Sequence, residues 1–228
     1  MQRPSRILPG IALLALLGAG VASLSARSGA DLTAGPALYE ISITNLTSNQ
    51  IISPPLVLTH NESVRLFTPG DQASAELAAL AEDGDSSGLM AQLSTDPGVF
   101  DMTAGATGID PGATLTVSLS ADRAFPYLSL AGMLVTTNDA FIGLDGATSV
   151  PMDQEGAFLV PVWDAGSEAN SENGMYIPGP PFGNGGVHDP APAEGFIHLH
   201  SGIHGIADVA PQTYDWGSYG AMVRFRRL

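Results

Sequence analysis

Residues 113–119 read Ala113-Thr114-Leu115-Thr116-Val117-Ser118-Leu119, and their apolar and polar side chains alternate without interruption. This period of two is typical of a half-buried β-strand, because successive side chains of a strand point to opposite faces of the sheet. The turn residues Asp110-Pro111-Gly112 come directly before the strand. The pattern therefore predicts β structure from Gly112 onward.

Other segments carry the same kind of signal. The further strands that we expect are residues 38–46, 127–135, 157–163, 195–200 and 221–226, with an extended, proline-kinked segment over 51–60. Residues 127–135 are almost wholly apolar, which predicts a strand buried on both faces. Residues 177–192 are rich in proline and glycine and are expected to form a long irregular loop.

Helical signals are few. Residues 73–80 have apolar positions at helical spacing, with Asp71 as the expected N-cap. A second short helix is expected over residues 86–93. Several short strands with one or two short helices in the connecting loops predict an all-β fold, an antiparallel β-sandwich.

The first thirty residues have the features of a secretory signal peptide. A basic start, Met1-Gln2-Arg3-Pro4-Ser5-Arg6, precedes an apolar run from Ile7 to Leu17 and then small residues. Cleavage is expected between Ser23 and Ala30, which leaves residues 31–228 as a single domain. No later run approaches the eighteen apolar residues of a membrane span, so the mature chain is expected to be secreted, extracellular or periplasmic. A retained N-terminal anchor is the alternative.

The composition limits the classes of partner. The chain has 23 acidic residues against 8 basic ones, a formal net charge of −15, and no lysine. This charge argues against nucleic acid or an anionic membrane as a partner, because neutralising phosphates requires Lys and Arg. The chain also has no cysteine, so disulfides cannot stabilise this exported domain.

Two acidic loops each follow an apolar run. The first is Thr136-Thr137-Asn138-Asp139-Ala140-Phe141-Ile142-Gly143-Leu144-Asp145, and the second is Val162-Trp163-Asp164-Ala165-Gly166-Ser167-Glu168-Ala169-Asn170. If strands 128–135 and 159–163 are neighbours, Asp139 and Asp164 emerge at one edge of the sandwich, and Glu168 can fold back through Gly166. Converging carboxylates repel one another unless a cation neutralises them, and oxygen ligands suit calcium. Solvated acids in a very acidic protein are the alternative interpretation.

These segments resemble the spondin N-terminal domain, also called the F-spondin domain. The strongest likeness is Trp163-Asp164-Ala165-Gly166-Ser167-Glu168, similar to the family's Tyr-Asp-Ala-Gly-Thr-Asp. Residues 133–145 are similar to the family's apolar strand and Pro-Ser-Pro-Asp-Trp-Phe-Val-Gly pattern. Residues 59–70, running into 73–74 and 80–84, and the terminal Asp215-Trp216 complete the order, so that the resemblance covers most of residues 38–228.

The resemblance implies an extracellular β-sandwich with one calcium ion at one end, held by Asp139, Asp164 and Glu168. Residues Thr136, Thr137, Asn138 and Ala140 depart from the family pattern, and Glu168 replaces an Asp. The implied function is a secreted, non-enzymatic adhesion or recognition module with a structural calcium ion. Its partner would be an extracellular or cell-surface protein or glycan.

A second candidate site consists of His198, His200 and His204. Residues two apart on a strand share a face, and Gly202 could turn His204 back toward them, a spacing that could bind zinc or copper. A zinc- or copper-binding protein or a metalloenzyme is therefore the alternative function, although such a pair is also compatible with a structural role. The chain has no Gly-x-Ser-x-Gly elbow and no cysteine nucleophile, so no nucleophilic catalysis is predicted.

Overall fold

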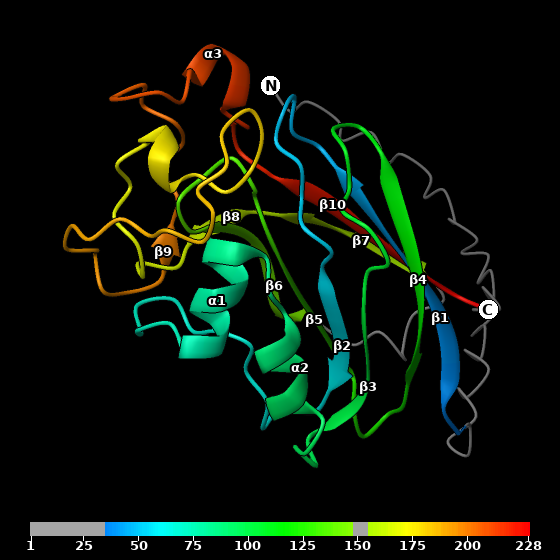
Figure 1. Ribbon diagram of the computed structural model, residues 1–228. Coiled ribbons are helices and arrows are strands. Elements are labelled where there is room, and N and C mark those ends of the chain that lie inside the picture. The colour runs from blue at the N-terminus through cyan, green and yellow to red at the C-terminus, as the bar shows by residue number, and fades with distance from the viewer. Residues whose placement is uncertain (1–34, 148–154) are drawn as a thin grey trace, which may run out of the picture. The chain divides into compact units, whose positions relative to one another are not determined.

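The computed structural model describes residues 35–147 and 155–228, in which two antiparallel sheets form a β-sandwich (Figure 1). One sheet has the order β4-β1-β10-β7 and the other the order β3-β2-β5-β6-β8-β9. The four strands of the first sheet are β4 (Thr114–Ala121), β1 (Ala37–Asn45), β10 (Ala221–Arg227) and β7 (Glu155–Val160). The six of the second are β3 (Val99–Ala104), β2 (Leu56–His60), β5 (Tyr127–Met133), β6 (Ala140–Ala147), β8 (Val162–Asp164) and β9 (His198–Leu199). The predicted β-sandwich is confirmed. The predicted signal peptide, residues 1–30, lies outside the described residues.

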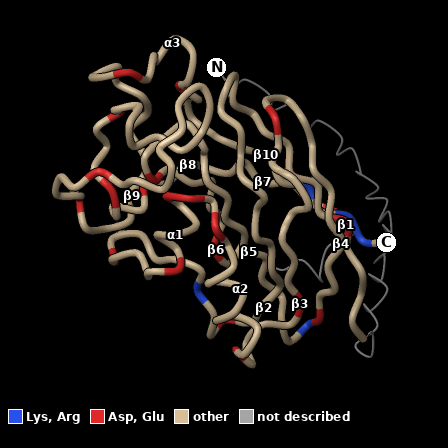
Figure 2. Tube along the Cα trace, in the orientation of Figure 1, with Lys and Arg blue, Asp and Glu red and all other residues tan. Residues whose placement is uncertain are grey.

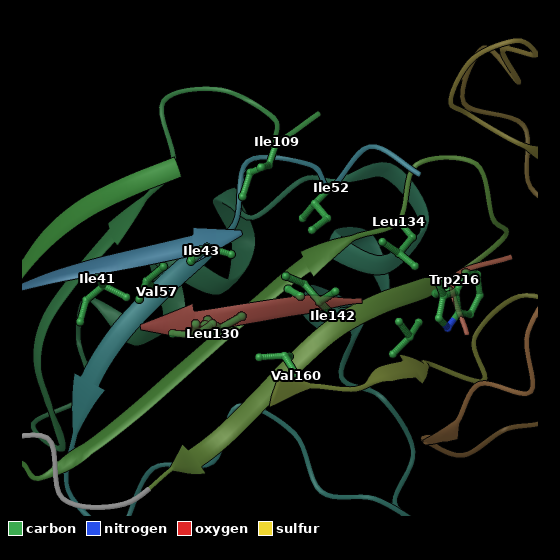
Figure 3. Packing of buried hydrophobic residues seen from close by; sticks show 14 of the residues in the cluster. Ile41, Ile43, Ile52, Val57, Ile109, Leu130, Leu134, Ile142, Val160 and Trp216 are labelled. Carbon is green, nitrogen blue, oxygen red and sulfur yellow. The ribbon is translucent and has the colours of Figure 1, made fainter. Parts of the chain in front are cut away.

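The main core lies between the two sheets. In β1, Tyr39, Ile41 and Ile43 are fully buried and alternate with polar residues on the outer face. They belong to a cluster that includes Leu130 of β5 and Ile142 of β6. Figure 3 shows Ile41, Ile43, Leu130 and Ile142 between the sheets. Each buried aliphatic side chain stabilises the fold by about 1.5–3 kcal/mol.

A second core covers the other face of the six-stranded sheet. The helices α1 (Ala75–Asp83) and α2 (Ser87–Leu93) lie over this face (Figure 1). Their buried leucines pack on Leu56 and Leu58 of β2 and on Phe141 of β6. Both faces of β2 and β5 are therefore buried, as the apolar run of 127–135 predicted.

Two local predictions were wrong. Ser74 caps α1, since its hydroxyl accepts a hydrogen bond from the Leu77 amide at 3.1 Å, whereas the Asp71 carbonyl accepts one from the Ile197 amide. Residues 157–163 form two strands in place of one, because β7 pairs with β10 and β8 pairs with β6. Pro161 stands between them, and proline has no amide hydrogen for a continuous ladder.

The remaining elements connect the sheets. A 3₁₀ turn spans Gly174–Tyr176, and the short helix α3 (Pro211–Tyr214) precedes β10. Residues 177–192 contain no helix or strand, as predicted, and lie beside β8 and β9 (Figure 1). Among the described residues, no helix is both long and apolar enough to cross a membrane.

Candidate metal centre

Asp139 and Asp164 meet at one end of the six-stranded sheet. Asp139 directly precedes β6, Asp164 ends β8, and the pairing of these strands sets Ala140 opposite Asp164. Both acids are buried, with 0% and 1% of their surface exposed. The sequence predicted that the two would meet but not by this route, because β6, which was not predicted as a strand, lies between β5 and β8.

Among the described residues, one oxygen of the Asp139 carboxylate has hydrogen-bond partners and the other has none. Its Oδ2 accepts hydrogen bonds from the amides of Ser167 and Glu168, at 2.8 and 3.0 Å. Its Oδ1 is buried and has no hydrogen-bond partner among the described residues. Burial and the nearby charge of Asp164 raise the pKa of Asp139 to about 7. A buried, unpartnered carboxylate oxygen next to a second acid is an unfavourable arrangement unless a proton or a cation binds there.

The carboxylate of Asp164 is held on both sides. Its Oδ1 accepts the Gly166 amide at 2.7 Å, and its Oδ2 accepts the Asn170 side-chain amide at 2.5 Å. Burial raises its pKa, and these hydrogen bonds oppose that effect. The Nε2 atom of His198 lies 3.7 Å from Oδ1, and Glu194 completes a group whose ligand atoms lie within 4.8 Å of one another.

Gly166 is required by the shape of this loop. Its φ of +63° belongs to the left-handed region that favours glycine, and a Cβ atom there would collide with the backbone of Phe196. The Gly195 amide donates to the Gly166 carbonyl at 2.9 Å. The absence of a side chain thus lets the segment around residue 195 lie against the loop that carries Asp164.

The third predicted ligand, Glu168, is divided between two environments. Its backbone amide binds Asp139, but its carboxylate turns toward helix α1. Glu168 Oε1 accepts hydrogen bonds from the Asn138 side chain (3.1 Å) and the Asp189 amide (2.8 Å). Glu168 Oε2 lies 3.3 Å from His188 Nδ1. The structure therefore brings Asp139 and Asp164 together and sets the Glu168 carboxylate in a neighbouring group.

His188 is the centre of that neighbouring group. Its Nδ1 atom lies 3.1 Å from Glu82 Oε2, and its Nε2 atom lies 3.5 Å from Asp83 Oδ2. Burial alone would lower the pKa of His188, but the hydrogen bond to Glu168 and the charges of Asp83 and Glu82 raise it above its ordinary value. A protonated His188 balances part of this charge and ties the loop of residues 177–192 to α1.

The predicted histidine set does not converge. His200 packs against Trp216 with ring centroids 4.9 Å apart, and His204 Nε2 bonds the Ser201 hydroxyl at 2.7 Å. Among the described residues, the three histidines form no group with ligand atoms within 4.8 Å of one another. His198 groups with Asp164 and Glu194, and His200 Nε2 lies 3.9 Å from Asp164 Oδ2. The alternative built on three histidines therefore reduces to two histidines, His198 and His200, beside Asp164.

Sequence reasoning missed several of the residues around the centre. Asn170 stands in the same quoted loop as Asp164, and an amide within reach of two acids was a signal that could have been used. Glu194 lies among prolines and alanines, and Glu82 lies in the last turn of α1, so neither position carries a pattern that indicates a site. Figure 2 shows the resulting acidic loops near β8 and β9, whereas the arginines of β10 lie toward the C-terminus.

A family model described as Spondin_N matches residues 47–173, more than half of the chain. The matched range includes Asp139, Asp164 and Glu168 and ends before Glu194 and His198. No curated protein matches the chain.

Proposed function

We propose a function for this chain, which belongs to the spondin N-terminal domain family. In this proposal it is a secreted, non-enzymatic recognition module with a structural calcium ion. The observation that carries the proposal is the buried Oδ1 atom of Asp139, which has no hydrogen-bond partner among the described residues and lies near Asp164. A divalent cation between the two carboxylates would neutralise both. The relief of repulsion between the two carboxylates would favour binding of the cation.

The chemistry of the donors fits calcium. Calcium takes six to eight oxygen ligands, largely carboxylates, carbonyls and waters. Asp139 and Asp164 supply carboxylate oxygens, and Glu194 lies within reach of Asp164. Glu168 would contribute through its backbone amide, which orients Asp139, and its carboxylate would have to leave Asn138 and His188 to ligate the ion itself.

Calcium at this end would hold several segments of the chain together. The centre joins residue 139, the loop after β8 and the segment before β9, which are far apart in the sequence. Two exposed apolar residues lie within two positions of His198 in the sequence, namely Phe196 (45%) and Leu199 (61%). The Phe196 ring lies 5.1 Å from that of His198. We infer that calcium holds these side chains as a fixed surface for an extracellular or cell-surface protein or glycan.

Calorimetric titration of calcium into the metal-free protein tests the proposal. We expect one ion per chain, with binding abolished in Asp139→Asn and strongly weakened in Asp164→Asn. Asp101→Asn is the matched control, because the Asp101 carboxylate also accepts a backbone amide, that of Ser120 at 2.7 Å, but lies outside the centre. Retained binding in Asp139→Asn, or no binding by the unmodified protein, would refute a calcium site here.

The same titration decides the role of Glu168. If its carboxylate turns to ligate calcium, as the resemblance implies, Glu168→Gln lowers the affinity by a large factor. If Glu168 acts through its backbone alone, as in the arrangement described above, the Gln variant keeps most of the affinity. The two outcomes separate a ligand from a residue that only orients Asp139.

One observation favours a second candidate, a transition-metal site. Asp164, Glu194 and His198 place two carboxylates and an imidazole within 4.8 Å, a mixed nitrogen and oxygen set that zinc accepts. The His198→Ala variant discriminates between the two ions, because calcium does not need the imidazole. Loss of zinc binding with calcium binding unchanged would identify His198 as a zinc ligand.

A further inference from the structure

The side chain of Asn170 links the carboxylates of Asp164 and Glu194. Its Nδ2 atom donates to Asp164 Oδ2 at 2.5 Å and to Glu194 Oε1 at 3.2 Å. An amide nitrogen carries two hydrogens, so each carboxylate can receive its own. Asn170 therefore ties the exposed Glu194 to the buried Asp164 without adding charge.

The orientation of this amide is set by His200. The side chain of His200 is only 5% exposed, and its Nδ1 atom accepts a hydrogen bond from the Gly202 amide at 3.0 Å. The neutral ring must then carry its hydrogen on Nε2, which donates to Asn170 Oδ1 at 3.2 Å. The Asn170 oxygen is thus drawn toward His200, and its NH₂ group is left facing the carboxylates.

The position of the His200 ring supports this assignment, because its Nδ1 atom accepts the Gly202 amide and therefore carries no hydrogen. The ring is also fixed from behind by Trp216, whose plane meets it at 71° with centroids 4.9 Å apart. The His200 amide donates to the Val162 carbonyl at 3.1 Å, which anchors the residue to the strand that carries Asp164.

A reversed amide would be unfavourable. With the Asn170 oxygen turned toward Asp164 and Glu194, three acceptor oxygens would face one another, and the Nε2–H of His200 would face an NH₂ group. Each mismatch costs on the order of 1–3 kcal/mol when the groups are buried. The network from Gly202 through His200 therefore admits one orientation of the Asn170 amide, with its NH₂ group toward Asp164.

We propose that Asn170, held by His200, is a positioning residue of the cation centre that aligns the Asp164 carboxylate and keeps Glu194 beside it. The proposal rests on the proposed function and deepens it, since neither residue touches the ion in this scheme. Hydrogen bonds to a ligating carboxylate restrict its rotation before the ion arrives. Loss of such an outer partner typically lowers metal affinity by about 10- to 100-fold.

Titration of calcium alone into the full chain and four variants tests this proposal. We expect Asn170→Ala to weaken calcium binding by about 10- to 100-fold. His200→Ala should weaken it as well, whereas His200→Gln should restore most of the affinity, because a glutamine amide can donate to Asn170 Oδ1. Asn49→Ala is the matched control, since Asn49 is an exposed asparagine whose Nδ2 donates to the Thr213 carbonyl at 2.9 Å.

Each outcome bears on the proposal. If Asn170→Ala binds calcium as the unmodified protein does, Asn170 is not a positioning residue, while the calcium centre stands. If His200→Ala and His200→Gln lose affinity equally, the His200 hydrogen bond plays no part. If the unmodified protein binds no calcium, both this proposal and the proposed function fail. Should Asn170→Ala not fold, the two His200 variants, which keep Asn170, still decide the matter.

Discussion

Replacing Asp139 with Asn is expected to make the metal-free protein more stable and the calcium-loaded protein less stable than the unmodified one. The carboxylate of Asp139 is fully buried, and its Oδ1 atom has no hydrogen-bond partner among the described residues. Asn removes the charge and keeps one oxygen for the amides of Ser167 and Glu168. Its NH₂ group can then donate toward Asp164.

The size of the effect follows from the pKa of Asp139. A pKa raised from 3.8 to about 7 corresponds to about 4 kcal/mol of destabilisation above pH 7 in a metal-free protein. The weaker hydrogen bonds that a neutral amide oxygen accepts return about 1–2 kcal/mol of this. We therefore expect Asp139→Asn to gain about 2 kcal/mol, or roughly 4–8 °C in Tm for a domain of this size.

Calcium reverses the order of the two proteins. At one hundred times its Kd, calcium stabilises a one-site protein by about 2.7 kcal/mol, roughly 5–11 °C here. Calorimetric scans at about pH 8, with chelator or with excess calcium, measure both effects. A chelated Asp139→Asn protein that melts below the unmodified one, together with an equal calcium increment in both, would refute the reasoning. The Asp101→Asn control should keep the full calcium increment.

Three further predictions concern proton competition and two local contacts. Calcium binds the ionised form of Asp139, whose pKa in the folded protein is raised to about 7. Calorimetry should therefore show the calcium affinity falling on the order of tenfold for each pH unit below that value. The metal-free protein should gain stability as the pH falls through the same range, because the folded state then binds the proton more tightly than the unfolded state. An affinity independent of pH would contradict this. Ser74→Ala removes the cap of α1 and should cost about 1 kcal/mol in denaturant unfolding, with calcium affinity unchanged. Gly166→Ala adds a Cβ atom against the backbone of Phe196, at a φ of +63°. We expect the free energy of unfolding to fall by about 1–3 kcal/mol and calcium binding to weaken. A variant as stable as the unmodified protein would contradict this prediction.

The sequence predicted the architecture because each long strand keeps a strict pattern. Residues 113–119 alternate, as a half-buried strand requires, and residues 127–135 are almost wholly apolar, as a fully buried strand requires. The segment 140–147 was missed as a strand because Asp145 and two glycines interrupt its apolar run. Only the neighbouring strands β5 and β8 determine that this segment is extended.

For the candidate centre, local pattern located Asp139 and Asp164 but not their surroundings. Two acidic residues that each adjoin a strand of one sheet can be recognised in the sequence. The direction of the Glu168 side chain cannot be predicted in this way, because it depends on His188 and α1, which come from distant parts of the chain. The same holds for Glu194, which meets Asp164 only because a glycine at 166 lets two loops touch.

Pro161, which divides β7 from β8, has a consequence for how the molecule withstands proteases. One short stretch serves both sheets, so the loop after Asp164 keeps its place only while β7 stays paired with β10 and β8 with β6. Interactions that are absent from the folding transition state act mainly on the unfolding rate. We expect calcium bound there to slow unfolding, and for a chain without disulfides the unfolding rate governs resistance to proteases.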